Sequence, residues 1–169
     1  MTEYDQEIPT DVTYEFTITD STHQQYKCSQ SIIRWIKNNL EALVDDYDSR
    51  IFSKVNYGYN EENIKGFGKK PVADVYINNI SYSSTLYDNK PSTATSFIIV
   101  YMKGNMNKTY EKACELTDFL IQQFEENDSF RELDYVVRNT DVSNVELQII
   151  PQGKTYGVIS AFELEHQLY

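Results

Sequence analysis

The chain has 169 residues and a formal net charge of -11. This length fits one domain, and a chain of this size buries about 70% of the surface that its unfolded form exposes. The acidic balance excludes binding of nucleic acid by phosphate neutralisation, which needs clustered Lys and Arg, and argues against docking on anionic membranes. The longest apolar run, Phe97 to Met102, is too short to span a bilayer, and the acidic N-terminus carries no apolar leader segment, so we expect a soluble protein that is not secreted.

Tyrosine is unusually frequent, with 14 residues. Its side chain combines a large rigid apolar body with a polar tip, which suits half-buried sheet faces and also suits contact surfaces between proteins. Both interpretations stay open at this point.

The first 30 residues are polar, and the first twenty contain acids but no base. Within them, Val12, Tyr14, Phe16 and Ile18 alternate with polar residues, which predicts one strand. Such a strand can pair with an edge of its own sheet or with the edge of a neighbouring subunit's sheet. We therefore divide the chain into an acidic N-terminal arm with one strand, residues 1–30, and a single α+β domain, residues 31–169.

A first helix is expected to begin near Ser29 or Ser31, either of which can cap it, and to end at the acidic cluster around Asp45. Trp35 lies just off its apolar stripe and is predicted to cover the rim of the core. The stripe consists of Ile32, Ile33, Ile36, Leu40, Leu43 and Val44.

The segment 56–71 that follows holds three glycines among aromatic and basic residues. It has neither the strand before it nor the helix after it that a phosphate-binding loop requires, so we expect a surface loop. Two strands come next. Val72–Tyr82 should contain a bulge near Asn79, and Ser96–Lys103 has the continuous apolar run typical of a central strand. Together they predict a hairpin with a long tip.

The segment Lys108–Glu126 has the clearest helical periodicity of the chain. We expect Asn107 or Thr109 to cap this helix and Asn127 to end it. A short turn with Ser129 and Glu132 at capping-box spacing should follow. Three strand-like runs complete the chain: Tyr135–Arg138, Val145–Ile150 and Tyr156–Leu164. The predicted fold class is α+β, with a mixed or antiparallel sheet, two main helices packed on one face, and an N-terminal arm that contains a strand.

We find no constellation for catalysis, for a cofactor or for a metal ion. His23 and His166 have no partner at ligand spacing and are expected to be exposed. Cys28 and Cys114 lie far apart and are expected to be reduced thiols, with Cys114 on the buried stripe of the long helix. Adjacent acids on a helix project about 100° apart and do not share a cation site. We therefore expect a protein that is not an enzyme.

The order of elements from Ser31 to Leu164 resembles a known family. A first helix, a long-tipped hairpin, an amphipathic helix, a short acidic connection and terminal strands follow one another, and the most similar segment is Tyr110–Arg138. This order is similar to that of the tail terminator, or tail-completion, proteins at the neck of tailed bacteriophages. The acidic arm and the glycine-bearing loop are additions to the family pattern.

The resemblance implies a structural virion protein that forms a ring, often a hexamer, which terminates the tail tube and joins it to the head connector. Its partners would be further copies of itself, the tail tube protein and the head-completion or connector protein, with no membrane involved and assembly in the bacterial cytoplasm. DNA would pass through the lumen without specific binding, because lumenal carboxylates repel phosphates. The candidate lumen acids are Glu125, Glu126, Asp128, Glu163 and Glu165.

Aromatic anchors contribute strongly to interfaces, and several lie on the predicted loop and hairpin tip. The candidate subunit or ring interface residues are Tyr57, Tyr59, Phe67, Tyr82 and Tyr87. They could instead pack on their own sheet. Two other functions stay open: an acidic protein-binding module that mimics nucleic acid and blocks a basic protein, and another neck component such as a stopper or adaptor.

Overall fold

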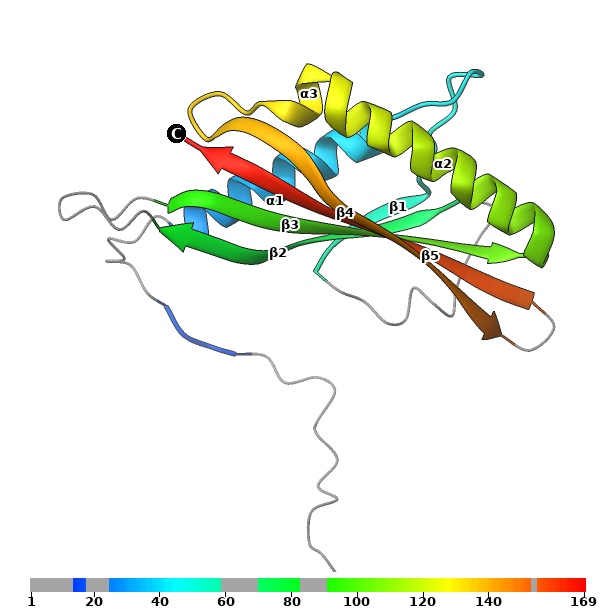
Figure 1. Ribbon diagram of the computed structural model, residues 1–169. Coiled ribbons are helices and arrows are strands. Elements are labelled where there is room, and N and C mark those ends of the chain that lie inside the picture. The colour runs from blue at the N-terminus through cyan, green and yellow to red at the C-terminus, as the bar shows by residue number, and fades with distance from the viewer. Residues whose placement is uncertain (1–13, 18–24, 59–69, 83–90, 153–154) are drawn as a thin grey trace, which may run out of the picture.

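The computed structural model describes residues 14–17, 25–58, 70–82, 91–152 and 155–169. In chain order the elements are α1 (Gln25–Ala42), β1 (Lys54–Tyr57), β2 (Val72–Tyr82), β3 (Pro91–Gly104), α2 (Met106–Glu126), α3 (Asp128–Arg131), β4 (Val137–Gln152) and β5 (Thr155–Leu168). The strands form one five-stranded sheet in the order β1-β2-β3-β5-β4. β1 is parallel to β2, and the other neighbours are antiparallel. Both long helices lie on one face (Figure 1), so the predicted α+β class is confirmed.

The long helix α2 follows directly from its apolar periodicity. Every third or fourth residue is buried against the sheet: Thr109, Ala113, Thr117, Leu120 and Phe124. The Phe124 ring packs edge-on against Phe130 and Phe162, with centroid separations of 5.3 and 5.5 Å. The helix ends before Asn127, as predicted.

The predicted helix starts were wrong. α1 begins before Ser29 and Ser31, inside the range assigned to the arm, and α2 begins before Asn107 and Thr109. The proposed caps therefore lie within the helices. Capping residues are common outside caps, and tertiary packing of the apolar face extends a helix past a local start signal.

The cap of the short helix α3 also differs from the prediction. The side-chain oxygen of Asn127 accepts a hydrogen bond from the backbone N–H of Ser129 at 3.0 Å, so Asn127 and not Ser129 caps this helix.

The strand predictions were correct at the centre of the sheet and wrong at its edges. β3 lies between β2 and β5, as its apolar run indicates, and a register shift between Ile77 and Asn79 confirms the predicted bulge. The short strand β1 was not predicted. β4 unites two runs that the sequence separated, with a second shift between Val142 and Asn144. An edge strand tolerates polar residues on its solvent side, so the polar stretch between the runs does not interrupt it.

The core lies between the helices and one face of the sheet. Ile32, Ile36 and Leu40 of α1 are at most 1% exposed. They share a single apolar cluster with Val75 of β2 and Phe162 of β5, among others. Successive strand residues point to opposite faces, so the residues between those core positions lie on the face that carries none of the described helices, called the helix-free face below.

The arm residues that the structure describes, 14–17, form no strand, and the expectation of a strand is not met there. The Tyr14 and Phe16 side chains are 81% and 76% exposed. Val12 and Ile18, the other members of the alternating pattern, lie outside the described residues.

Candidate functional site

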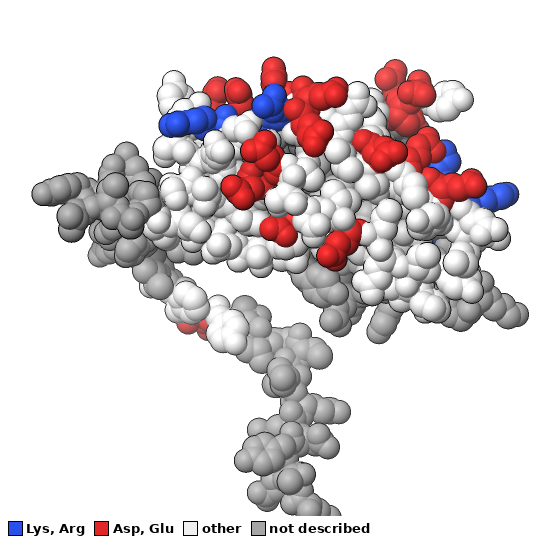
Figure 2. All heavy atoms as spheres, in the orientation of Figure 1, with Lys and Arg blue, Asp and Glu red and all other residues white. Residues whose placement is uncertain are grey.

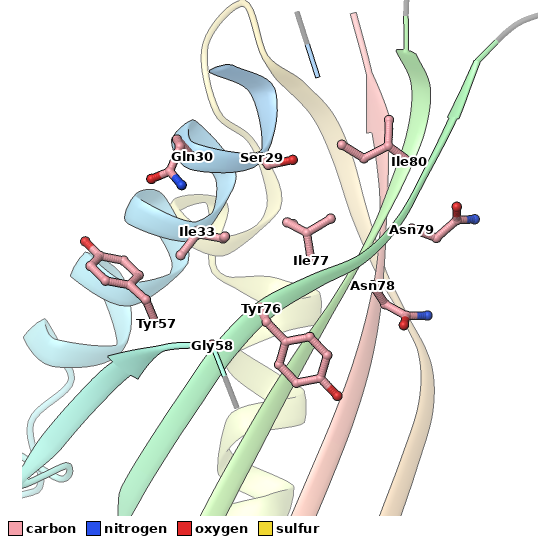
Figure 3. Close-up of a pocket in the computed structure, with 10 residues that line it drawn as sticks. All are labelled: Ser29, Gln30, Ile33, Tyr57, Gly58, Tyr76, Ile77, Asn78, Asn79 and Ile80. Atoms are coloured by element: carbon pink, nitrogen blue, oxygen red, sulfur yellow. The ribbon is translucent and has the colours of Figure 1, made fainter. Parts of the chain in front are cut away.

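A groove lies where the edge of the sheet is left open beside α1. β1 pairs with β2 only from Val72 to Val75, and no described strand continues along the outer edge of β2 beyond that point. The groove has a volume of about 580 Å³ (Figure 3). Its lining comes from α1, from the end of β1 and from the second half of β2: Ser29, Gln30, Ile33, Tyr57, Gly58, Tyr76, Ile77, Asn78, Asn79 and Ile80.

The groove combines an apolar centre with polar rims. Ile33 of α1 and Ile77 of β2 point toward one another, whereas the side chains of Asn78 and Asn79 point away from α1 (Figure 3). No charged side chain is among the described lining residues. A strand edge beside a helix with an apolar floor suits an extended polypeptide segment, which hydrogen-bonds to the strand edge and places alternate side chains against the floor.

Only two of the five predicted interface residues lie in described parts of the chain. Tyr57 lines the groove, is 55% exposed, and has the Lys37 ammonium 5.2 Å from its ring centroid. Tyr82 ends β2 and is 38% exposed. Tyr59, Phe67 and Tyr87 lie outside the described residues. The structure therefore places Tyr57 at the groove, at the end of β1, and Tyr82 at the end of the neighbouring strand β2.

The candidate lumen acids fall into two groups on opposite sides of the sheet. Glu125 and Glu126 end α2 and Asp128 begins α3, so all three lie on the helix side. Glu163 and Glu165 alternate along β5 with the buried core residues, which places them on the helix-free side. The structure therefore does not bring the two groups together.

Further acids join Glu163 and Glu165 on the helix-free face. Asp141 is the register partner of Glu165, and Glu146 is the partner of Ala161 on the same face. The basic residues of β4 and β5 do not offset them, since Arg138 is the sole Lys or Arg in these two strands and stacks over Tyr169 at 5.2 Å. On the opposite side, Figure 2 shows many Asp and Glu side chains over α2 and α3, with few Lys or Arg.

His166 is buried, and the expectation that it is exposed was wrong. Its ring is 0% exposed on the helix side of β5. Nε2 lies 2.7 Å from Ser96 Oγ on β3, and Nδ1 lies 2.8 Å from Thr140 Oγ1 on β4. Trp35 of α1 meets the ring edge-on at a centroid distance of 5.8 Å. His166 of β5 therefore links β3 and β4 through its two ring nitrogens, beneath α1.

The setting of His166 makes it a structural residue. Burial lowers its pKa from 6.5 to about 4, so the ring is neutral at pH 7. Ser96 and Thr140 are themselves at most 1% exposed, so the two hydroxyl groups beside the His166 ring are buried with it. Continuing the alternation of Phe162 and Leu164 by two residues would have placed His166 in the core, a signal that the sequence analysis missed.

The outer edge of β4 is the second open edge of the sheet, since no described strand pairs with it. Leu147 and Ile149 on its helix side are 40% and 39% exposed. Their neighbours Glu146 and Gln148, on the other side, are exposed as well. This strand therefore presents both an apolar and a polar row at the boundary of the sheet.

The described ranges were compared with the requirements of a metal site and of a membrane-spanning helix. No three His, Cys, Asp or Glu side chains in these ranges are grouped so that they could hold a metal ion. No helix in the same ranges is long and apolar enough to cross a bilayer. Cys114 is a free, half-buried thiol on α2, whereas the side chain of Cys28 lies outside the described residues.

No family model matches the chain, and no curated protein matches it. Solved structures do give matches, to 22 chains. One of these, which bears no functional name, is 14% identical, covers 83% of this chain and 97% of its own, and has a TM-score of 0.43. At this distance the likeness carries no argument about function.

Proposed function

We propose that this chain is a structural subunit that forms a closed ring at the neck of a tailed bacteriophage, where it terminates the tail tube and joins it to the head connector. The observation that carries the proposal is that two different edges of one sheet, at β2 beyond Val75 and along β4, are paired with no described strand. A subunit with two unlike contact surfaces associates head to tail, and such contacts generate rings when the rotation closes.

The acids of the helix-free face support the same proposal. In a ring that turns this face inward, Asp141, Glu146, Glu163 and Glu165 line the passage. Their charge repels phosphates within about a Debye length, roughly 8 Å at physiological salt, so DNA passes without adhering. Glu125, Glu126 and Asp128 then lie on the outer side. Because the candidate acids in the described residues are divided between two faces of the sheet, they do not favour the inhibitor hypothesis.

The experiment is to measure the mass of the full chain across a concentration series, with negative-stain imaging of the same samples. We expect closed rings with a central hole at high concentration. Monomers at every concentration would contradict the proposal. The double variant Glu163→Lys/Glu165→Lys tests the lumen: it should form the same rings but retain DNA at low salt, whereas Glu125→Lys/Glu126→Lys, the control on the other side, should not.

A further inference from the structure

The exposed arm segment 14–17 has the residue alternation of a strand but pairs with no described strand. Tyr14 and Phe16 stand 81% and 76% exposed, and Glu15 and Thr17 alternate with them. In an extended segment this alternation puts both aromatic rings on one face and the polar side chains on the other. Two neighbouring aromatic side chains in solvent are typical of a segment that binds another surface.

The outer edge of β4 carries the matching pattern. From Glu146 to Ile149 its residues alternate between the polar, helix-free side and the apolar, helix side, and all of them are exposed. A strand added to this edge with its aromatic side chains beside Leu147 and Ile149 would continue the apolar row, and its polar side chains would continue the polar row. A shift by one residue would invert both rows, so the match selects one face orientation.

The reach of the arm decides whose edge it meets. Thr17 and Gln25 are eight Cα steps apart, which extend to at most about 28 Å. The second turn of α1, at Ser29 and Gln30, lines the groove together with Ile80, which is level with Thr140 across the sheet. A strand added outside β4 at Leu147 lies roughly 19 Å from Ile80 measured across the strands and roughly 20 Å measured along them. The straight-line distance is therefore about 28 Å. A path around the body and the first helical turn both add to this distance, so the arm does not reach its own β4.

We propose that residues Tyr14–Thr17 of one copy add as an extra strand to the outer edge of β4 in a second copy. Tyr14 and Phe16 then lie beside Leu147 and Ile149, and Glu15 lies opposite Gln148, which keeps it from facing Glu146. The inference rests on the self-assembly of the proposed function and names the contact that produces it. The arm leaves the body beside β2 and the acceptor is the opposite edge, so the contact is head to tail, as a ring requires.

A cross-linking experiment locates the contact. In a Cys28→Ser/Cys114→Ser background, copies carrying Phe16→Cys are mixed with copies carrying Leu147→Cys and oxidised. We expect a disulfide between unlike copies. A matched mixture with Asn79→Cys, at the groove beside α1, should give little product. Preferential linkage to position 79, or linkage to neither position, would overturn the proposal. So would a bond within a single chain that carries both Phe16→Cys and Leu147→Cys at high dilution.

The second experiment measures assembly by sedimentation across a concentration series. Tyr14→Ser/Phe16→Ser should raise the midpoint concentration strongly without changing the circular dichroism of the body. Gln148→Glu places a carboxylate opposite that of Glu15. Because the two like charges repel, this variant should raise the midpoint concentration of assembly roughly fivefold. Adding Glu15→Gln should restore it, and the control Thr17→Ser should change nothing.

The outcomes of the sedimentation experiment separate the two proposals. If the natural chain assembles and the arm and Gln148 variants assemble equally well, the arm contact is wrong, while the ring function stands. If the natural chain stays monomeric at every concentration, both proposals are wrong.

Discussion

Acidification should weaken the fold through His166. The ordinary pKa of 6.5 applies when the chain is unfolded, and burial lowers the folded-state value to about 4. Between these two pKa values the unfolded chain binds a proton at His166 and the folded chain does not. The free energy of unfolding therefore falls as the pH drops. The gap corresponds to roughly 3 kcal/mol, at about 1.4 kcal/mol per pKa unit. The stabilisation is complete above about pH 6.5 and lost by about pH 4.

Urea unfolding, followed by the fluorescence of Trp35, measures this effect between pH 7 and pH 4. Trp35 is the single tryptophan of the chain and contacts the His166 ring, so its emission reports on the region concerned. The matched variant is His166→Gln, which keeps a polar amide at the site and does not titrate. At pH 7 the natural chain should be more stable by about 1–3 kcal/mol, because the variant loses a buried hydrogen bond and ring packing.

The difference between the two chains isolates the histidine. All other residues are the same in the two chains, so their contributions to the pH dependence cancel in the difference. We expect the advantage of the natural chain to shrink by roughly 3 kcal/mol on going to pH 4, so that the variant becomes the equal or more stable form. An advantage that stays constant from pH 7 to pH 4.5 would refute the assignment of His166 as a buried, neutral residue.

Three other substitutions test the packing by urea unfolding at pH 7. Leu120→Ala should cost about 2–5 kcal/mol, because Leu120 is 0% exposed in the core, whereas the exposed control Asp118→Ala should change stability by less than about 0.5 kcal/mol. Trp35→Phe removes the Nε1–H that donates to the Ser129 carbonyl at 2.7 Å and should cost about 1 kcal/mol; no loss would mean that water replaces this bond. Thr117→Val removes the buried hydroxyl that lies 3.1 Å from Ser160 Oγ and should cost about 1–2 kcal/mol, and an unchanged midpoint would show that this pair does not stabilise the fold.

The sequence by itself determined the elements whose residues contact the core along one regular stripe. α2 has a buried residue every third or fourth position and ends at Asn127, as its pattern predicts. β3 is a continuous apolar run because both of its faces are buried: Ile98 and Val100 on the helix side are at most 1% exposed, and Ile99 and Tyr101 on the other side are 9% and 0% exposed. In both cases the buried positions form a regular pattern within one short segment, so that segment alone predicts the element.

The tertiary structure alone decided the edges of the sheet and what lies at them. β1 is a four-residue strand that exists because it pairs in parallel with Val72–Val75, far along the chain. β4 passes through a polar stretch because only one of its edges is paired. His166 is buried because Ser96 and Thr140, on two other strands, complete its hydrogen bonds. The two groups of acids separate for the same reason, since strand order and face are set by long-range pairing. Local periodicity records whether a residue is buried, but not which distant partner buries it, and so the open edges at β2 and β4 appear only in the folded chain.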